Sequence, residues 1–148
     1  MKKYNSLKQI QQDLYNSSIS CEELVESYLK NISKNKQLNA FIETYDNEAK
    51  QIAKQIDVKI KNKTAGPLAG LVIGIKDNIC YKNHYSSASS KILQGFQSTY
   101  SATVVDRLLS ADAIILGRLN CDEFAMGSSN ENSIHGPVKN PINNSCVP

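Results

Sequence analysis

A lysine at the end of an apolar run is the residue of this sequence best placed to do chemistry. Lys76 directly follows Leu71–Ile75, a run rich in β-branched residues that a Gly-Pro turn at Gly66–Pro67 precedes. Such a run, bounded by turn residues, is typical of a buried strand. Lys76 would then sit where the strand leaves the sheet, with Asp77 and Asn78 after it. A lysine in that place either points back into water, as most lysines do, or takes part in catalysis.

A second candidate is a segment of small polar residues in the last thirty positions. It begins at Met126, Gly127, Ser128 and Ser129 and continues to Ser133. Polar loops of this kind line binding pockets, and they also form ordinary surface coil. Composition alone leaves both interpretations open.

The cysteines and histidines do not indicate a metal site or a disulfide framework. Two histidines, His84 and His135, have no matching cluster of Cys, Asp or Glu nearby in the sequence. The four cysteines are far apart and form no C-x-x-C pair, which favours free thiols. A cysteine nucleophile is a weaker alternative to the lysine, because Cys80 and Cys121 have no base beside them in the sequence.

Bulk composition indicates an ordinary globular protein. A length of 148 residues suits one domain, and 41% hydrophobic with 21% charged residues argues against disorder. The net charge of +3 comes from scattered lysines without interleaved aromatics, so no nucleic-acid groove is indicated. The polar start Met1–Ser6 does not resemble a signal peptide, and no stretch has the roughly 20 apolar residues of a membrane span. We therefore expect a cytoplasmic protein that makes no contact with a membrane.

Helical patterns dominate the first part of the chain. Ser20 and Glu23 form an S-x-x-E capping box, and Ser6 is placed to cap an earlier helix. Ala40–Tyr45 is expected to be a short strand, after which Asp46 opens a third helix. The polar run 59–64 suggests a boundary between an amino-terminal helical region, 1–62, and a core that begins at 63 and continues to 148.

The sequence pattern of the second region, 63–148, predicts a strand, a loop, a helix and a second strand. The helix is expected to be capped by Thr99 or Ser101, and the second strand to cover Ala113–Leu116 and end at Gly117. This succession indicates an α/β protein with two parallel strands in a sheet covered on both faces. Active sites in such sheets lie outside the carboxyl ends of the strands, where Lys76 and the segment after Gly117 both fall.

Several motifs from residue 66 onward resemble those of the amidase signature family, and in particular the A subunits of tRNA-dependent amidotransferases. An I-K-D-N element at Ile75–Asn78 marks amidases in general, while the run D-E-F-A-M-G-S-S at Asp122–Ser129 is much more specific to the A subunits. Further matching pieces are Gly66–Gly70, Ala88–Leu93, Ala102–Val105, Glu131–Ser133 and Asn140–Pro141. The helical start and Asn39–Ile42 are similar too, so the resemblance spans nearly the whole chain.

The resemblance implies a mixed sheet covered by helices, of which this chain would hold only the first strands. It also implies glutamine hydrolysis, which releases ammonia to convert Glu-tRNA(Gln) to Gln-tRNA(Gln), or Asp-tRNA(Asn) to Asn-tRNA(Asn), during translation. Partner subunits B and C complete a heterotrimer, and the partner uses ATP and Mg, so no cofactor is expected on this chain. By the same resemblance Met126, Gly127, Ser128 and Ser129 line the glutamine pocket.

In this family catalysis uses a Ser–cis-Ser–Lys triad, and Lys76 matches its lysine. That lysine takes a proton and so has to be neutral, although a free lysine has a pKa near 10.4; burial at the strand end is expected to favour the neutral form. We expect Asp77 to turn away from Lys76 and to bond to backbone. The family places both serines beyond Pro148, so the 148-residue chain alone is predicted to be inactive.

Two alternatives stay open. The chain could belong to another amidase that hydrolyses small amides, against which the D-E-F-A-M-G-S-S run argues. It could also be a non-catalytic remnant that only binds partner subunits.

Overall fold

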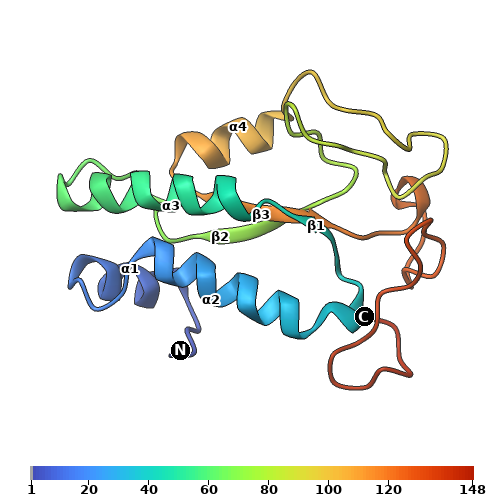
Figure 1. Cartoon of the computed structure of the whole chain (residues 1–148), viewed down its shortest axis with the longest axis horizontal. Helices are drawn as coiled ribbons and strands as arrows, with labels where there is room; N and C mark the ends of the chain where they lie inside the picture. The colour runs from blue at the N-terminus through green and yellow to red at the C-terminus, as the bar shows by residue number, and fades with distance from the viewer. Residues whose placement is uncertain (1) are drawn as a thin grey trace.

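A three-stranded sheet with helices on both faces organises residues 2–148, the part of the chain that the computed structural model describes (Figure 1). The strand order is β1-β3-β2, formed by β1 (Phe41–Thr44), β3 (Ile114–Leu119) and β2 (Val72–Lys76). Strand β1 pairs with β3 antiparallel, and β2 pairs with β3 parallel. The expected α/β class and the expected parallel pair are both confirmed.

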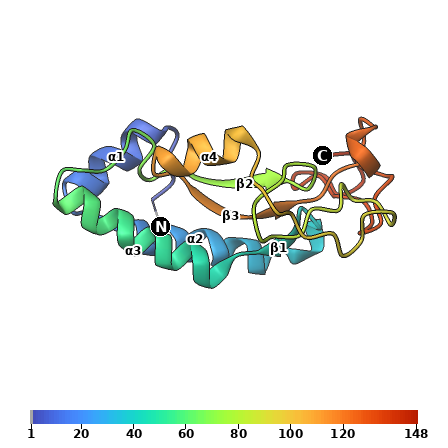
Figure 2. The same cartoon turned by 90° about the horizontal axis from the view of Figure 1, so that it is seen from above.

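The helices form the outer layers of the molecule. Helices α2 and α3 lie on one side of the sheet and α4 on the other (Figure 2). Their bounds are α1 (Leu7–Tyr15), α2 (Cys21–Lys34), α3 (Asp46–Lys61) and α4 (Thr103–Ser110), with two short 3-10 helices, η1 (Lys36–Leu38) and η2 (Glu123–Ala125). No helix within residues 2–148 is long and apolar enough to cross a membrane.

Side-chain caps explain where the first helices begin. The Ser6 hydroxyl accepts a hydrogen bond from the amide of Gln9, and Ser20 and Glu23 cap one another's backbone, as the sequence predicts. Asp57 adds a cap that sequence does not reveal, because its carboxylate accepts from the first amides of α2 although it lies on α3. Such caps typically contribute about 1 kcal/mol each.

The predicted cap of α4 is wrong. Ala102 occupies the cap position and makes no side-chain bond there. Ser101 is used elsewhere, since its hydroxyl accepts a hydrogen bond from the amide of Lys82 at 3.1 Å. This bond ties the start of α4 to the loop that follows β2, and a tertiary contact therefore replaces the local one.

Two apolar clusters fill the space between the layers. The cluster on the side of α2 and α3 joins the helical region to the sheet through Ile10, Leu14, Leu24, Val25, Ala49, Ala53, Ile56, Ile114 and Leu116. The cluster beneath α4 contains Tyr45, Ile75, Tyr81, Val105 and Ile115. The proposed division of the chain near residue 62 stays a prediction.

A β-bulge in β3 decides which side chains face α4. Ile73 pairs with Ile115, but the next pair is Gly74 with Gly117, so Leu116 is an extra residue. Beyond the bulge Arg118 lies opposite Ile75 and shares its face of the sheet. Regular alternation would have placed Arg118 with Ile114 and Leu116, in the other apolar cluster.

Both strands extend further than their apolar runs. Strand β2 includes Lys76, which pairs with Leu119, and β3 continues through Gly117 and Arg118. The two backbones keep their ladder of hydrogen bonds regardless of side-chain polarity, which explains the longer strands. Lys76 is thus the last residue of β2 and not the first residue after it.

Asp112 occupies a backbone conformation that favours glycine, with φ at +65°. Its carboxylate accepts hydrogen bonds from the amide of Gly66 at 2.6 Å and from the ammonium of Lys59 at 2.5 Å. Burial disfavours the charged form, but these two donors outweigh it and lower the pKa of Asp112. The side chain thereby offsets a backbone conformation that costs most residues about 1–2 kcal/mol.

Candidate functional site

The loops that carry the candidate residues gather at one end of the sheet. The loop after β2 and the long segment after β3 both leave the sheet at the carboxyl ends of these parallel strands (Figure 2). Lys76 ends β2, and Asn120, Cys121 and Asp122 follow directly after β3. This is the edge at which α/β proteins place their sites.

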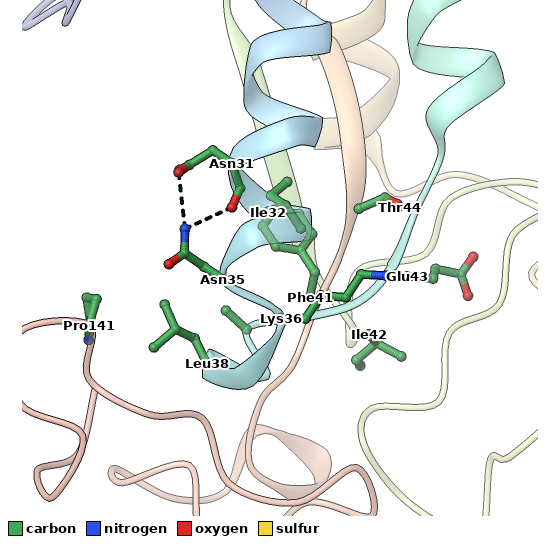
Figure 3. Close-up of a pocket in the computed structure, with 11 residues that line it drawn as sticks. Asn31, Ile32, Asn35, Lys36, Leu38, Phe41, Ile42, Glu43, Thr44 and Pro141 are labelled. Atoms are coloured by element: carbon green, nitrogen blue, oxygen red, sulfur yellow. Dashed lines mark hydrogen bonds between the residues drawn. The ribbon is translucent and has the colours of Figure 1, made fainter.

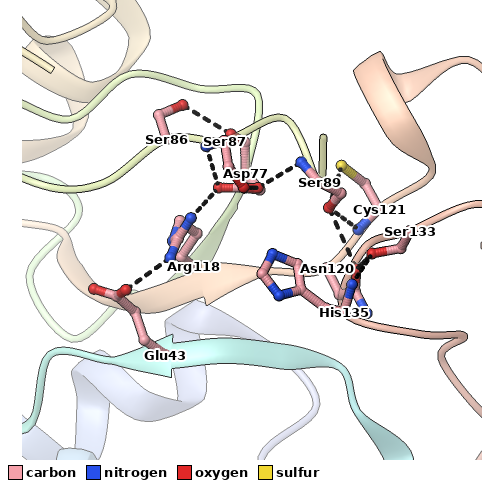
Figure 4. Close-up of polar contacts among 10 residues, drawn as sticks. All are labelled: Glu43, Asp77, Ser86, Ser87, Ser89, Arg118, Asn120, Cys121, Ser133 and His135. Carbon is pink, nitrogen blue, oxygen red and sulfur yellow. Dashed lines mark hydrogen bonds and ion pairs between the residues drawn. The ribbon is translucent and has the colours of Figure 1, made fainter. Parts of the chain in front are cut away.

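Asp77 is the most deeply buried charge at this end, with a relative exposure of 0%. Its carboxylate accepts hydrogen bonds from the amides of Ser87 and Ser89, at 3.0 and 2.6 Å, and from the Ser87 hydroxyl at 2.6 Å. Its backbone carbonyl accepts from the Ser86 hydroxyl and from the amide of Ala88. Ser86, Ser87 and Ser89, which look like polar loop residues in the sequence, are thus buried partners of Asp77 (Figure 4).

Arg118 completes the environment of Asp77. One guanidinium nitrogen lies 2.5 Å from the Asp77 carboxylate, and a second lies 2.8 Å from the carboxylate of Glu43 on β1. The three side chains therefore tie β1, β3 and the end of β2 together (Figure 4). Arg118 and Asp77 are both buried, so water does little to screen the ion pair between them.

Burial and hydrogen bonding shift the pKa of Asp77 in opposite directions. Burial disfavours the carboxylate, but the serine donors and Arg118 outweigh it and hold the pKa of Asp77 below its ordinary value. The expectation that Asp77 turns away from Lys76 and bonds to backbone is confirmed: its carboxylate binds two amides, and no ion pair joins the two residues in the described part of the chain.

The prediction that Lys76 is buried is wrong. Within residues 2–148, the part of the chain that the structure describes, its side chain is exposed. Consecutive residues of a strand point to opposite faces, so Lys76 points away from the face that Asp77 and Arg118 share. The apolar cluster on the Lys76 face includes Val72 of β2 but no later residue of that strand. Strand β2 is also at an edge of the sheet, which leaves Lys76 without cover.

The segment predicted to line a pocket folds around Asp122. Met126 is 79% exposed, and Gly127 and Ser128 are exposed as well. Ser129 is half-buried and donates its hydroxyl to the carboxylate of Glu131 at 2.7 Å. These four residues form an open loop beside the end of β3, and their predicted role in binding glutamine stays a prediction.

Asn120 holds three loops in place at the same end of the sheet. Its side-chain oxygen accepts from the hydroxyls of Ser89 and Ser133, at 3.3 and 2.6 Å. Its side-chain nitrogen donates to the carbonyls of Asn39 and Gly136, at 3.2 and 2.9 Å. The amide is therefore fully used, and it fixes the loops relative to one another (Figure 4).

A hollow of the described chain reaches these residues only at Glu43, which also binds Arg118. It has a volume of about 580 Å³ and is bounded by the end of α2, by β1 and by Pro141 (Figure 3). Ile32, Leu38 and Phe41 contribute apolar surface, but neither Lys76 nor the loop at 126–129 lines it. Because Lys76 and the loop at 126–129 lie outside this hollow, we do not assign the catalytic site to it.

Sequence reasoning missed the residues that build this end of the sheet. Arg118, Asn120 and Asp122 received no individual role, although each lies at or just beyond the end of an apolar run. Polar residues in that position are a usable signal, because the carboxyl ends of parallel strands meet at one edge. The buried serines had no such signal, since only the fold brings them to Asp77.

The model of the family described as Amidase matches residues 23–148. The A subunit of glutamyl-tRNA(Gln) amidotransferase from Chlorobium phaeobacteroides is 44% identical over 146 residues, which are 98% of this chain and 31% of that protein. The chain therefore spans about a third of the length of this curated relative.

Two solved structures have a similar fold. A chain of a protein complex described in connection with the evolutionary origins of an s-triazine catabolic enzyme matches with a TM-score of 0.88 and 32% identity, over 94% of this chain and 31% of that one. The A subunit of glutamyl-tRNA(Gln) amidotransferase from Thermotoga maritima matches with a TM-score of 0.70 and 27% identity, over 99% of this chain and 30% of that one.

Removing Arg118 is expected to destabilise the fold strongly. In Arg118→Met the Asp77 carboxylate stays buried without its charged partner, which typically costs about 3–5 kcal/mol. Urea unfolding at pH 7 would measure the loss. Arg107→Met on α4 is the matched control, because Arg107 is exposed. Equal unfolding midpoints for the two variants would contradict the importance of the ion pair.

The acid dependence of stability is expected to report on Asp77. Because its pKa is lowered on folding, its contribution is fully present above the ordinary Asp value, about 3.9, and is lost as the pH falls through the folded value. Asp77→Asn should therefore be less stable than the parent at pH 7 and lose less stability between pH 5 and pH 2. Asp106→Asn, which removes an exposed carboxylate, should retain the parent's acid profile. Identical acid profiles for parent and Asp77→Asn would show that Asp77 does not carry this dependence.

Proposed function

The chain belongs to the amidase family, and from that membership we propose that it forms part of the glutamine-hydrolysing A subunit of a tRNA-dependent amidotransferase. The observation that carries the proposal is the 44% identity to such a subunit over 98% of the chain. The run Asp122–Ser129, which resembles these subunits much more specifically than the I-K-D-N element does, lies in the loop beside the end of β3.

In the proposed reaction a serine attacks the side-chain amide carbon of glutamine, and ammonia leaves with the proton taken from that serine. Water then cleaves the resulting acyl-serine and releases glutamate. Lys76 accepts the proton of that serine through a bridging serine, in a variant of nucleophilic acyl transfer. Both serines follow Pro148 in the family, so they come from the remainder of a complete subunit. Support for Lys76 comes from its place at the carboxyl end of β2, beside a carboxylate that is fully occupied by other donors.

The exposure of the Lys76 side chain matters for its proposed role as a proton acceptor. A lysine that accepts a proton has to be neutral, and burial favours the neutral form. The residues described here leave the side chain uncovered at the edge of the sheet. We therefore assign the covering surface to the remainder of the complete subunit.

The proposal extends to partners and cofactors. Subunits B and C would complete a heterotrimer in the cytoplasm, and ATP and Mg would be used by the partner and not by this chain. The ammonia would convert Glu-tRNA(Gln) to Gln-tRNA(Gln), or Asp-tRNA(Asn) to Asn-tRNA(Asn), in protein synthesis. Met126, Gly127, Ser128 and Ser129 would contact glutamine.

One observation favours a second candidate, a hydrolase of small amides. The TM-score is higher with the peptide amidase of Stenotrophomonas maltophilia, 0.86 at 29% identity, than with the Thermotoga maritima protein, 0.70. The motif at Asp122–Ser129 argues for the amidotransferase, so substrate tests should separate the two.

Loss of Lys76 is expected to abolish glutamine hydrolysis in a complete subunit. Residues 1–148 can replace the matching segment of the Chlorobium phaeobacteroides protein, which is then assembled with that organism's partner subunits. Lys76→Ala should lower kcat by about 10²–10⁴-fold, the range typical for loss of a general base. Ammonia release from glutamine and formation of Gln-tRNA(Gln) would be measured together.

Lys82→Ala is the matched control for this experiment, because Lys82 is an exposed lysine in the following loop. It should keep the parent's rate. Full activity of Lys76→Ala would refute the catalytic role of Lys76. Hydrolysis of simple amides in preference to glutamine, without transfer to tRNA, would favour the second candidate.

Residues 1–148 by themselves are expected to release no ammonia from glutamine, because they supply the lysine but neither serine of the triad. A coupled ammonia assay would check this at the concentration at which the complete subunit is active. Release that Lys76→Ala abolishes would overturn the assignment of both serines to the remainder of the subunit.

A further inference from the structure

We propose that Asp122 is a positioning residue, which fixes the glutamine-binding loop 126–132 against the end of β3. This inference rests on the proposed function for the identity of the substrate. The contacts that support it belong to the fold itself.

The Asp122 carboxylate accepts hydrogen bonds from the main chain of the loop. One oxygen accepts from the amide of Asn130 at 2.9 Å, and the other accepts from the amide of Asn132 at 3.0 Å. The amide of Glu123 donates to the carbonyl of Asn132 at 2.6 Å, which closes the loop back onto the residue after Asp122. Asp122 is only 6% exposed, so these bonds are shielded from water.

Gly127 closes the loop around the same side chain. A methyl group added at Gly127 would collide with the Asp122 carboxylate. The space that glycine leaves free is therefore occupied by Asp122, and the sequence needs glycine here for close approach. Aspartate and glycine form one contact that two independent substitutions can disturb.

The backbone of this segment needs such a restraint. Phe124, Ala125 and Asn130 all have positive φ values, at 51°, 58° and 57°. Backbone in this region persists only where surrounding contacts hold it, and it is common in ligand-binding loops. The buried carboxylate supplies such a contact at Asn130, and the backbone carbonyls of Ala88 and Asp122 accept from the amides of Phe124 and Ala125.

The Asp122 carboxylate is occupied by the backbone of its own loop. Backbone donors, chiefly the amide of Asn132, lower the pKa of Asp122, and the nearby charge of Lys76 lowers it further. No ion pair within 4.0 Å joins the two side chains in the described part of the chain. Backbone amides thus occupy the carboxylate, and Lys76 stays available to the serine from which it takes a proton.

This arrangement assigns different tasks to the two residues. Lys76 moves a proton, whereas Asp122 sets the position of the main chain that receives glutamine. Loss of the carboxylate should therefore weaken substrate binding more than it slows the chemical step. A residue that only stabilised the fold would lower the amount of active enzyme and leave KM unchanged.

The test compares three variants in the assembled complex that carries residues 1–148 on a complete subunit. Asp122→Asn turns one acceptor oxygen into a donor that faces a backbone amide, and Gly127→Ala pushes against the same carboxylate. Each is expected to raise KM for glutamine at least tenfold and to change kcat less than threefold. Asp106→Asn makes the same charge change as Asp122→Asn on exposed surface, and it should leave both constants unchanged.

Hydrogen exchange of the amides of Asn130 and Asn132 gives a readout that does not depend on activity. Exchange at one or both should accelerate at least tenfold in Asp122→Asn and stay unchanged in Asp106→Asn. An unchanged KM, or unchanged exchange, in a folded Asp122→Asn variant overturns the proposal. If the parent complex does not hydrolyse glutamine, the proposed function fails, and the exchange result still decides whether Asp122 positions the loop.

Discussion

The buried pair of Asp77 and Arg118 is the interaction on which the arrangement of this end of the sheet depends. A carboxylate without exposure is stable only where donors surround it, and here two serine amides, one hydroxyl and a guanidinium do so. Arg118 extends the network to Glu43, so all three strands meet at one set of charges. The loop after β2 takes its shape from this pair, because its serines have to reach Asp77.

The same pair also determines where Lys76 points. Neighbouring residues in a strand face opposite sides of the sheet, so an inward Asp77 turns Lys76 to the other face. The chain thus holds a structural charge and a candidate catalytic charge in adjacent positions without letting them pair. Asp122 repeats this arrangement after β3, where a buried carboxylate binds backbone amides of its own loop and leaves Lys76 free.

Local signals predicted much of the fold. The capping box at Ser20 and Glu23, the cap at Ser6 and the two parallel strands all follow from patterns only a few residues long. The predicted cap of α4 failed because Ser101 makes a long-range bond to Lys82. Strand ends were also misplaced, since backbone pairing continues through Lys76 and Arg118 after the apolar side chains end.

The sequence by itself determined the family, the α/β class and the position of Lys76 at a strand end, because motifs and apolar periodicity are local properties. Only the tertiary structure decided which face each polar side chain occupies. The extra residue at Leu116 turns Arg118 toward Asp77, and no alternation pattern reveals that shift. The tertiary structure also decided which side chains are buried. The serines at 86–90 are covered because loops converge on them. Lys76 is exposed because β2 lies at an edge of the sheet.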